Sequence, residues 1–264
     1  MPRAFAADLH VHTFLSPCAS REMSPGSIVR RCREVGIDVV AITDHNTGGN
    51  VARAIAEANA EAAAEAAAAD VNANPCRSVL TVIAGMEVST VEDVHLLVLL
   101  PSLAALGEWE REVAIARAPG VNVREIFGEQ WVQDAATGEI REEHALLAAP
   151  TRLSVDDVAF RAAELGGICL PAHVDRPSFS ILGQLGFIPE HLDIPAVEIS
   201  RNTCGTQAFA HIPAIVGRTL VCSSDAHSLD EIGLGSSLIW AEAPTASEII
   251  MALRGVGGRR VEVL

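Results

Sequence analysis

Residues 6–13 read AADLHVHT, and this stretch determines how the rest of the chain is interpreted. The apolar residues at its start are typical of a buried strand, which leads directly into His10 and His12. On a strand, residues i and i+2 lie on the same face, so both imidazoles can reach one metal ion. A histidine on its own is more often an ordinary hydrogen-bonded residue, so the rest of the chain has to supply further ligands.

Short apolar runs of strand length recur along the chain and alternate with helical patterns. The predicted strands are residues 6–11, 38–43, 79–84, 94–100, 167–171, 196–200 and 219–223. The predicted helices include residues 27–35 behind a capped start at 24–26, residues 51–70 closed by 72–75, and residues 245–254. This alternation favours a parallel sheet, and seven strands favour an open or distorted α/β barrel.

Residues 102–157 interrupt the alternation with many charges and an Ala-Pro-Gly turn at 118–120. We expect a single domain over residues 1–264, in which 102–157 form a mainly helical insertion over the barrel mouth. Trp109 and Trp131 lie in this insertion, where core packing is favoured over stacking on a base.

The composition limits both location and partners. The chain opens without room for an apolar signal segment, and its apolar runs are shorter than the roughly 20 residues of a membrane span. These features predict a soluble cytoplasmic protein with no membrane partner. A net charge of −15 disfavours a grip on long nucleic-acid polymers, whereas bound metal ions would still allow a small anionic substrate.

All 19 basic residues are arginine, so the chain has no lysine. A P-loop lysine, a Schiff-base lysine and a carbamylated metal-bridging lysine are therefore excluded. The six cysteines form no C-x-x-C pair and are interpreted as reduced thiols, most of them in the core.

Further polar residues lie at or near the ends of the predicted strands, mostly at the carboxyl ends. They are His10, His12, His45, Glu87, His95, His173, Asp225 and His227. In α/β barrels, active sites assemble at the carboxyl ends of the strands. Histidine with carboxylate is the ligand set of Zn²⁺, Mn²⁺ or Fe²⁺ in hydrolytic sites, so these residues predict a metal centre.

These motifs, in this order, resemble those of the PHP (polymerase and histidinol phosphatase) family over nearly the whole chain. They are the segments 8–13, 43–45, 85–89, His95, 171–173 and 224–227. The resemblance implies a distorted (β/α)₇ TIM-like barrel whose trinuclear metal cluster hydrolyses phosphate esters through a metal-activated hydroxide. It also assigns ligands: His10, His12, Glu87 and Asp225 to a first metal, Glu87, His95 and His173 to a second, and His45 and His227 to a third. Asp44 is then expected to orient an imidazole.

One position departs from the family pattern. Many relatives place an aspartate shortly after the H-x-H pair as a ligand of the third metal, and this chain has none there. Cys18, a thiolate that would favour zinc, and Glu22 are the candidates to replace it. A third site that is weak or absent is the remaining alternative.

Phosphate also requires a positive partner, and Arg176 follows closely after His173. Because arginine pairs with phosphate in a bidentate manner, Arg176 is the preferred phosphate clamp, with a structural pairing to Asp175 as the alternative. Arg21 and Arg201 are second choices. Glu87, Asp225 and Arg176 are thus the predicted catalytic residues.

The substrate is expected to be a small phosphate monoester or the end of a nucleotide or short oligonucleotide. Two other functions stay open. One is an amidohydrolase-type hydrolase, which the missing lysine weakens, and the other is a non-catalytic metal-binding accessory module.

Overall fold

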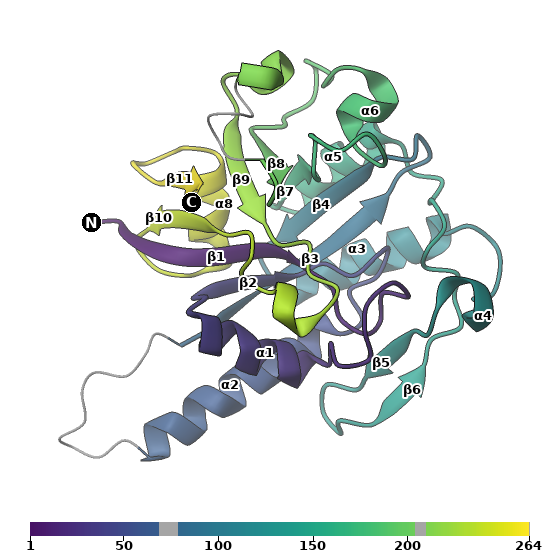
Figure 1. The fold of residues 1–264 in the computed structure, drawn as a ribbon, viewed down its shortest axis with the longest axis vertical. Coiled ribbons are helices and arrows are strands. Elements are labelled where there is room, and N and C mark those ends of the chain that lie inside the picture. The colour runs from purple at the N-terminus through teal and green to yellow at the C-terminus, as the bar shows by residue number, and fades with distance from the viewer. Residues whose placement is uncertain (69–78, 204–209, 264) are drawn as a thin grey trace.

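The computed structural model describes residues 1–68, 79–203 and 210–263, and its centre is a curled sheet of seven strands (Figure 1). The strand order is β11-β10-β1-β2-β3-β4-β7. These strands are β1 (Arg3–Val11), β2 (Val39–Ile42), β3 (Thr81–Ser89), β4 (His95–Leu100), β7 (Ile168–Pro171), β10 (Ser237–Ala241) and β11 (Arg260–Val263). Two further pairs stand apart from this sheet: β5 (Trp131–Gln133) with β6 (Ile140–Glu142), and β8 (Ala196–Ser200) with β9 (Thr219–Ser223).

The predicted helices are present, with ends set by local capping. Ser24 caps α1 (Pro25–Val35): the Oγ of Ser24 accepts from the Ser27 N–H. Gly36 ends the helix in the left-handed region, at φ 83°. The other helices are α2 (Val51–Ala68), α3 (Leu103–Ala116), α4 (Arg124–Phe127), α5 (Val155–Glu164), α6 (Ile181–Leu185) and α8 (Ala246–Leu253). The predicted stop at 72–75 lies outside the described residues. Within the described ranges, none of the helices has the length and apolar composition to cross a bilayer.

The expectation of a parallel sheet is wrong for β4, and β10, a strand that was not predicted, is also antiparallel to its neighbour β1. Strands β1, β2 and β3 run parallel, whereas β4 is antiparallel to both β3 and β7. Because β3 and β4 form a hairpin with no helix between them, the structure does not confirm seven β/α units. The reversal also explains an oddity of the sequence: His95 opens its strand, yet it pairs with Ser89 at the carboxyl end of β3.

The β8–β9 pair lies across the open side of the curled sheet. Beside β7, the Val174 N–H donates to the Glu198 carbonyl of β8 at 2.9 Å. On the other side, the segment after β9 reaches β1, where the His12 N–H donates to the Ala226 carbonyl at 3.0 Å. The arrangement is a mixed α/β fold consistent with a distorted barrel.

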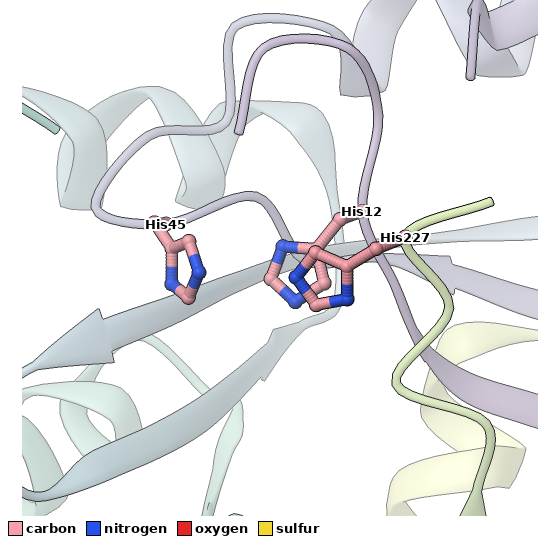
Figure 2. A group of neighbouring side chains, drawn as sticks. All are labelled: His12, His45 and His227. Atoms are coloured by element: carbon pink, nitrogen blue, oxygen red, sulfur yellow. The ribbon is translucent and has the colours of Figure 1, made fainter. Parts of the chain in front are cut away.

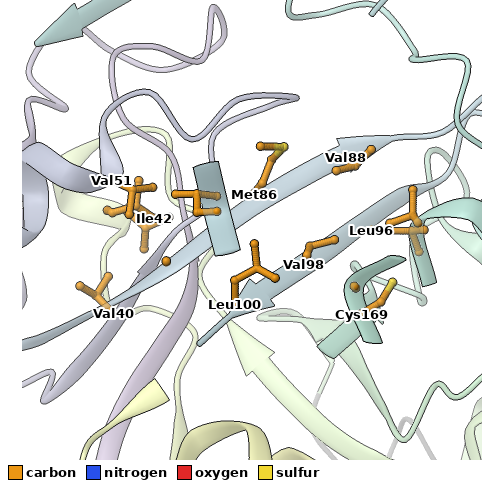
Figure 3. Close-up of a cluster of buried hydrophobic side chains, with 14 of the residues drawn as sticks. Val40, Ile42, Val51, Met86, Val88, Leu96, Val98, Leu100 and Cys169 are labelled. Carbon is orange, nitrogen blue, oxygen red and sulfur yellow. The ribbon is translucent and has the colours of Figure 1, made fainter. Parts of the chain in front are cut away.

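Alternate residues of the strands face two different apolar cores. The outer core lies under α1, α2, α3 and α5, and Figure 3 shows its strand residues, among them Ile42, Met86 and Val98. The inner core fills the concave side of the sheet, where Phe5, Leu97 and residues of α8 pack together. This inner face is the one that becomes polar at the carboxyl ends of the strands.

The segment 102–157 is less helical than expected. It holds α3, the single turn α4, the β5–β6 hairpin and the start of α5. Trp109 of α3 is fully buried in the outer core, and Trp131 is partly buried against it. Core packing of Trp109 is therefore confirmed.

Helix α8 closes the inner core, and Leu253 within it is fully buried. We expect Leu253→Ala to lower the free energy of unfolding by about 2–5 kcal/mol, because the lost contacts leave a cavity. Leu234→Ala is the matched control, because Leu234 is 63% exposed. This variant should change the free energy of unfolding by less than about 0.5 kcal/mol. Urea denaturation of both variants measures the difference, and equal effects would contradict this role of α8.

Candidate metal centre

A bulge in β1 aims the two first histidines into the concave side of the sheet. Asp8 pairs with Val40 and Val11 with Ile42, so β1 has one extra residue between these pairs. Within the bulge Leu9 faces the inner core, whereas Val11 after it faces the outer core. The Nε2 atoms of His10 and His12 then lie 3.0 Å apart, as their i, i+2 spacing predicts.

Glu87, at the carboxyl end of β3, lies at the centre of the predicted residues. Its carboxylate oxygens have imidazole nitrogens at 2.8–3.5 Å, and these belong to His10, His12, His45, His95 and His173. Asp225 Oδ1 lies 3.3 Å from Nε2 of both His10 and His12. The structure therefore brings these strand-end residues together in one place.

The centre is buried and yet has polar atoms without partners. Glu87 is 1% exposed, and neither of its oxygens has a hydrogen-bond partner of acceptable geometry among the described residues. The same holds for Nδ1 of His45. Buried acceptors left in this way are costly unless a cation lies between them. Imidazole and carboxylate donors in this arrangement fit divalent metal ions.

The charges of the centre are strongly coupled. Burial alone raises the pKa of Glu87, but the neighbouring His95, His10 and His45 outweigh it and hold that pKa well below its usual range. Burial likewise raises the pKa of Asp225, and His10 and His12 reverse the effect. Both groups are therefore carboxylates, the form that binds metal.

His10 is oriented by a residue that sequence reasoning missed. Its Nδ1 lies 2.9 Å from Oε2 of Glu198 in β8. Because a carboxylate only accepts, Nδ1 carries a proton, and Nε2 is the nitrogen that faces Glu87 and Asp225. Glu198 Oε2 also accepts from the His173 N–H at 3.0 Å. This carboxylate thus holds two of the predicted ligands in position.

His12 is oriented through Ser16. Ser16 Oγ donates to Asp44 Oδ1 at 2.7 Å, and its own oxygen accepts from His12 Nδ1 at 2.9 Å. Asp44 also accepts from the N–H and hydroxyl of Thr13. Asp44 therefore orients an imidazole as expected, but it does so through a serine and not by direct contact.

A second group of three histidines lies beside Glu87. His12, His45 and His227 offer ring nitrogens within 4.8 Å of one another, and Figure 2 shows their rings gathered from separate loops. His227 Nδ1 donates to the Asp225 carbonyl at 2.9 Å, which leaves Nε2 free as a ligand.

Cys18 lies beside this group. Its thiol is near the imidazoles of His227 and His45. Desolvation raises the pKa of the thiol, but these imidazoles outweigh it and lower the pKa to about 6. Neither the Cys18 thiol nor the Glu22 carboxylate belongs to a ligand group found among the described residues, so the third position stays a prediction.

Two of the predicted ligands have strained backbone. His173 has φ 33° and Asp225 has φ 52°, and neither is glycine. Non-glycine residues in this region cost about 1–3 kcal/mol and concentrate at functional sites. The hydrogen bonds to Glu198 and to the His227 ring help to keep these conformations in place.

Arg176 pairs with Asp225 and not with Asp175, the structural partner considered as the alternative. Its Nη1 lies 2.6 Å from Asp225 Oδ2, while Asp175 instead accepts from Ser200 and Thr203. Arg176 is partly exposed and faces a cavity of about 350 Å³ that opens onto the centre. The cavity is also lined by His45, Glu87, His95, His173, Asp225 and His227.

The three histidines outside the predicted set, and the two arginines ranked second, lie elsewhere. His144, His191 and His211 are exposed, and His191 pairs with Asp156. Arg21 pairs with Glu129 on the surface, and Arg201 pairs with Glu231. Glu231 in turn accepts from the His227 N–H, so Arg201 acts on the centre only at a distance.

Imidazole and carboxylate donors converging at the carboxyl edge of a curled α/β sheet define a metal-dependent hydrolase. Residues 8–158, more than half of the chain, match the family model described as the PHP domain, and the chain belongs to this family.

Solved structures with the same fold include the lesion-specific endonuclease Q of Pyrococcus furiosus, with a TM-score of 0.65 and 20% identity over 98% of this chain. A Bifidobacterium adolescentis protein classed as a metal-dependent phosphoesterase has a TM-score of 0.52 and 19% identity, over 86% of this chain and 89% of that one. The Bacillus subtilis (strain 168) protein YqxK is 28% identical over 38% of this chain. This chain spans 58% of the endonuclease Q chain and 27% of YqxK.

Glu198 gives a direct test of how the centre is supported. We expect Glu198→Gln to weaken binding of the tightest divalent metal about 10- to 100-fold, because His10 loses the carboxylate that fixes its tautomer. Competition with a chromophoric chelator measures this affinity. Glu164→Gln is the control, since the Glu164 side chain is 68% exposed on α5. An affinity unchanged in Glu198→Gln would show that this carboxylate has no part in metal binding.

Proposed function

We propose that this protein is a metal-dependent phosphoesterase with two or three divalent ions, Zn, Mn or Fe, at its centre. One observation carries the proposal: five imidazoles surround the buried carboxylate of Glu87, whose oxygens have no hydrogen-bond partner of acceptable geometry among the described residues. Membership of the PHP domain family supports the same activity.

The ligands divide into three groups around Glu87 and Asp225. His10, His12, Glu87 and Asp225 would hold one ion, and the distances of 3.0–3.4 Å among their ligand atoms support this set. Glu87, His95 and His173 would hold a second. His45, His227 and Cys18 would hold a third, with the Cys18 thiolate in place of the aspartate found in many relatives.

Bound there, divalent ions would lower the pKa of a water molecule and neutralise charge on a phosphoryl group. The chain itself supplies position and charge. One guanidinium nitrogen of Arg176 binds Asp225, and its other N–H groups are available to donate to phosphoryl oxygens. Negative charge builds up on these oxygens in the transition state. Glu87 and Asp225 keep the imidazoles at fixed separations while the substrate reacts.

The cavity of about 350 Å³ suits a small phosphate monoester or the end of a nucleotide or oligonucleotide. The expected exclusion of long nucleic acids is not supported, because an endonuclease Q structure of the same fold contains a 27-mer duplex with an abasic lesion at the active site. Duplex DNA is therefore a second candidate substrate.

A substrate screen tests the proposal on enzyme loaded separately with manganese, zinc and iron. It includes aryl phosphates, phosphorylated metabolites, short oligonucleotides, duplex DNA with and without an abasic site, and amide and lactam substrates. We expect phosphate release from at least one phosphate ester. Turnover confined to amides or lactams would favour an amidohydrolase, and no turnover with any metal would favour an accessory module.

The carboxylates at the centre give the second test. We expect Glu87→Gln and Asp225→Asn each to lower phosphoesterase turnover by roughly 100-fold, because an amide is a poor metal ligand and the imidazoles lose their shared partner. Steady-state kinetics at saturating metal measure the loss. Asp156→Asn, at an exposed position on α5, is the control. Full activity in both site variants would overturn the mechanism.

Cys18 and Glu22 can be separated by metal analysis. We expect Cys18→Ser to bind one ion fewer per chain and, with cobalt, to lose the thiolate charge-transfer absorption, because a thiolate is replaced by a weaker ligand. Glu22→Gln should match the wild type in both measurements. The reverse result would assign the third site to Glu22, and identical behaviour of all three proteins would remove both residues from it.

A further inference from the structure

The loop from His173 to Ser180 carries an aromatic ring at the mouth of the cavity. Phe179 lines the cavity together with Arg176 and metal-centre residues, and it is 44% exposed. Phe127, Phe160 and Phe187 are exposed to similar degrees, but none of them lines the cavity. Exposure alone does not distinguish Phe179 from these three residues, but its backbone conformation and its neighbours do.

The ring is held in place by strained and anchored backbone. Phe179 has φ 58°, which is rare for a bulky residue and costs about 1–3 kcal/mol. Its carbonyl accepts from the His95 N–H at 2.8 Å. One residue further on, Ser180 Oγ donates to the Arg176 carbonyl at 2.5 Å and caps α6. The His173 N–H, which donates to Glu198, anchors the other end of the loop, so the backbone that carries the ring is fixed on both sides.

One face of the ring is already occupied. The Phe179 ring stacks on the imidazole of His95, with centroids 4.8 Å apart and planes at 17°. The exposed part of the ring is therefore turned away from His95. A rigid aromatic surface beside an arginine and a metal centre matches a ligand with a phosphate at one end and a flat ring at the other.

We propose that Phe179 is a specificity-determining residue whose exposed ring stacks on the base of a nucleoside phosphate while the phosphate lies at the metal centre. This inference rests on the proposed phosphoesterase activity and narrows its substrate class. A free mononucleotide and the terminal nucleotide of a strand share this chemistry. Stacking on an aromatic side chain is worth about 5- to 150-fold in affinity per base.

A matched pair of substrates isolates the base. Adenosine 5′-monophosphate and ribose 5-phosphate have the same phosphorylated sugar and differ in the base. With the metal-loaded enzyme, we expect a higher kcat/KM for the nucleotide, and Phe179→Ala should lower that value about 10-fold while changing the value for ribose 5-phosphate less than about threefold. Phe179→Trp should keep the preference, because it retains an aromatic ring. Phe160→Ala, on the exposed face of α5, should behave as the wild type.

Two more measurements complete the test. The Kd of a non-hydrolysable phosphonate analogue of the nucleotide should rise in Phe179→Ala by the same factor as kcat/KM falls. A short 5′-phosphorylated single strand, compared with the mononucleotide, shows which source of the base is preferred.

The outcomes separate this inference from the proposed function. Equal losses on both substrates in Phe179→Ala would mean that the ring only supports His95, and would overturn the inference alone. A wild-type enzyme with no preference for the nucleotide would do the same. Absence of hydrolysis of every phosphate ester by the wild type would overturn the proposed function, and the inference with it.

Discussion

The carboxylate of Glu87 is buried among imidazole nitrogens, and the described part of the chain gives its oxygens no hydrogen bond of good geometry. Such a group is tolerable only while positive charge stays close to it, and the lowered pKa of Glu87 expresses this dependence. The surrounding fold can be understood as the means of keeping that charge in place. The bulge in β1 brings His10 and His12 to this carboxylate, and the reversed strand β4 brings His95. His173, with its strained backbone, adds a further nitrogen.

Support for the ligands comes from elements far apart in the sequence. Glu198 reaches His10 across 188 positions, and Asp44 reaches His12 through Ser16. In both cases an acceptor fixes the proton on Nδ1, so that Nε2 is free toward the centre. The inner core beneath them, closed by α8, gives these partners a rigid base. Metal affinity is therefore expected to depend on packing as well as on the ligands.

The open side of the centre has a different character. Arg176 and Phe179 lie on one short loop. The loop starts at the candidate ligand His173 and ends at Ser180, which caps α6. One end of the loop offers charge and the other an apolar ring. Under the proposed function, a few residues of one loop would select the substrate, while the candidate ligands come from elements across the sheet.

The sequence by itself determined the ligand types and their association with strand ends, because strand periodicity is local and the carboxyl ends of parallel strands share one edge. It also predicted β1, β2, β8, β9 and the helix α1 near their observed bounds. Only the tertiary structure decided the reversal of β4, the part of Glu198 and the pairing of Arg176 with Asp225. Direction of a strand and contact between distant side chains depend on how the chain closes on itself, and no local pattern around Glu198 distinguishes it from an ordinary strand residue. The bulge that turns both His10 and His12 inward is likewise a product of pairing with β2, not of the HVH motif that first pointed to them.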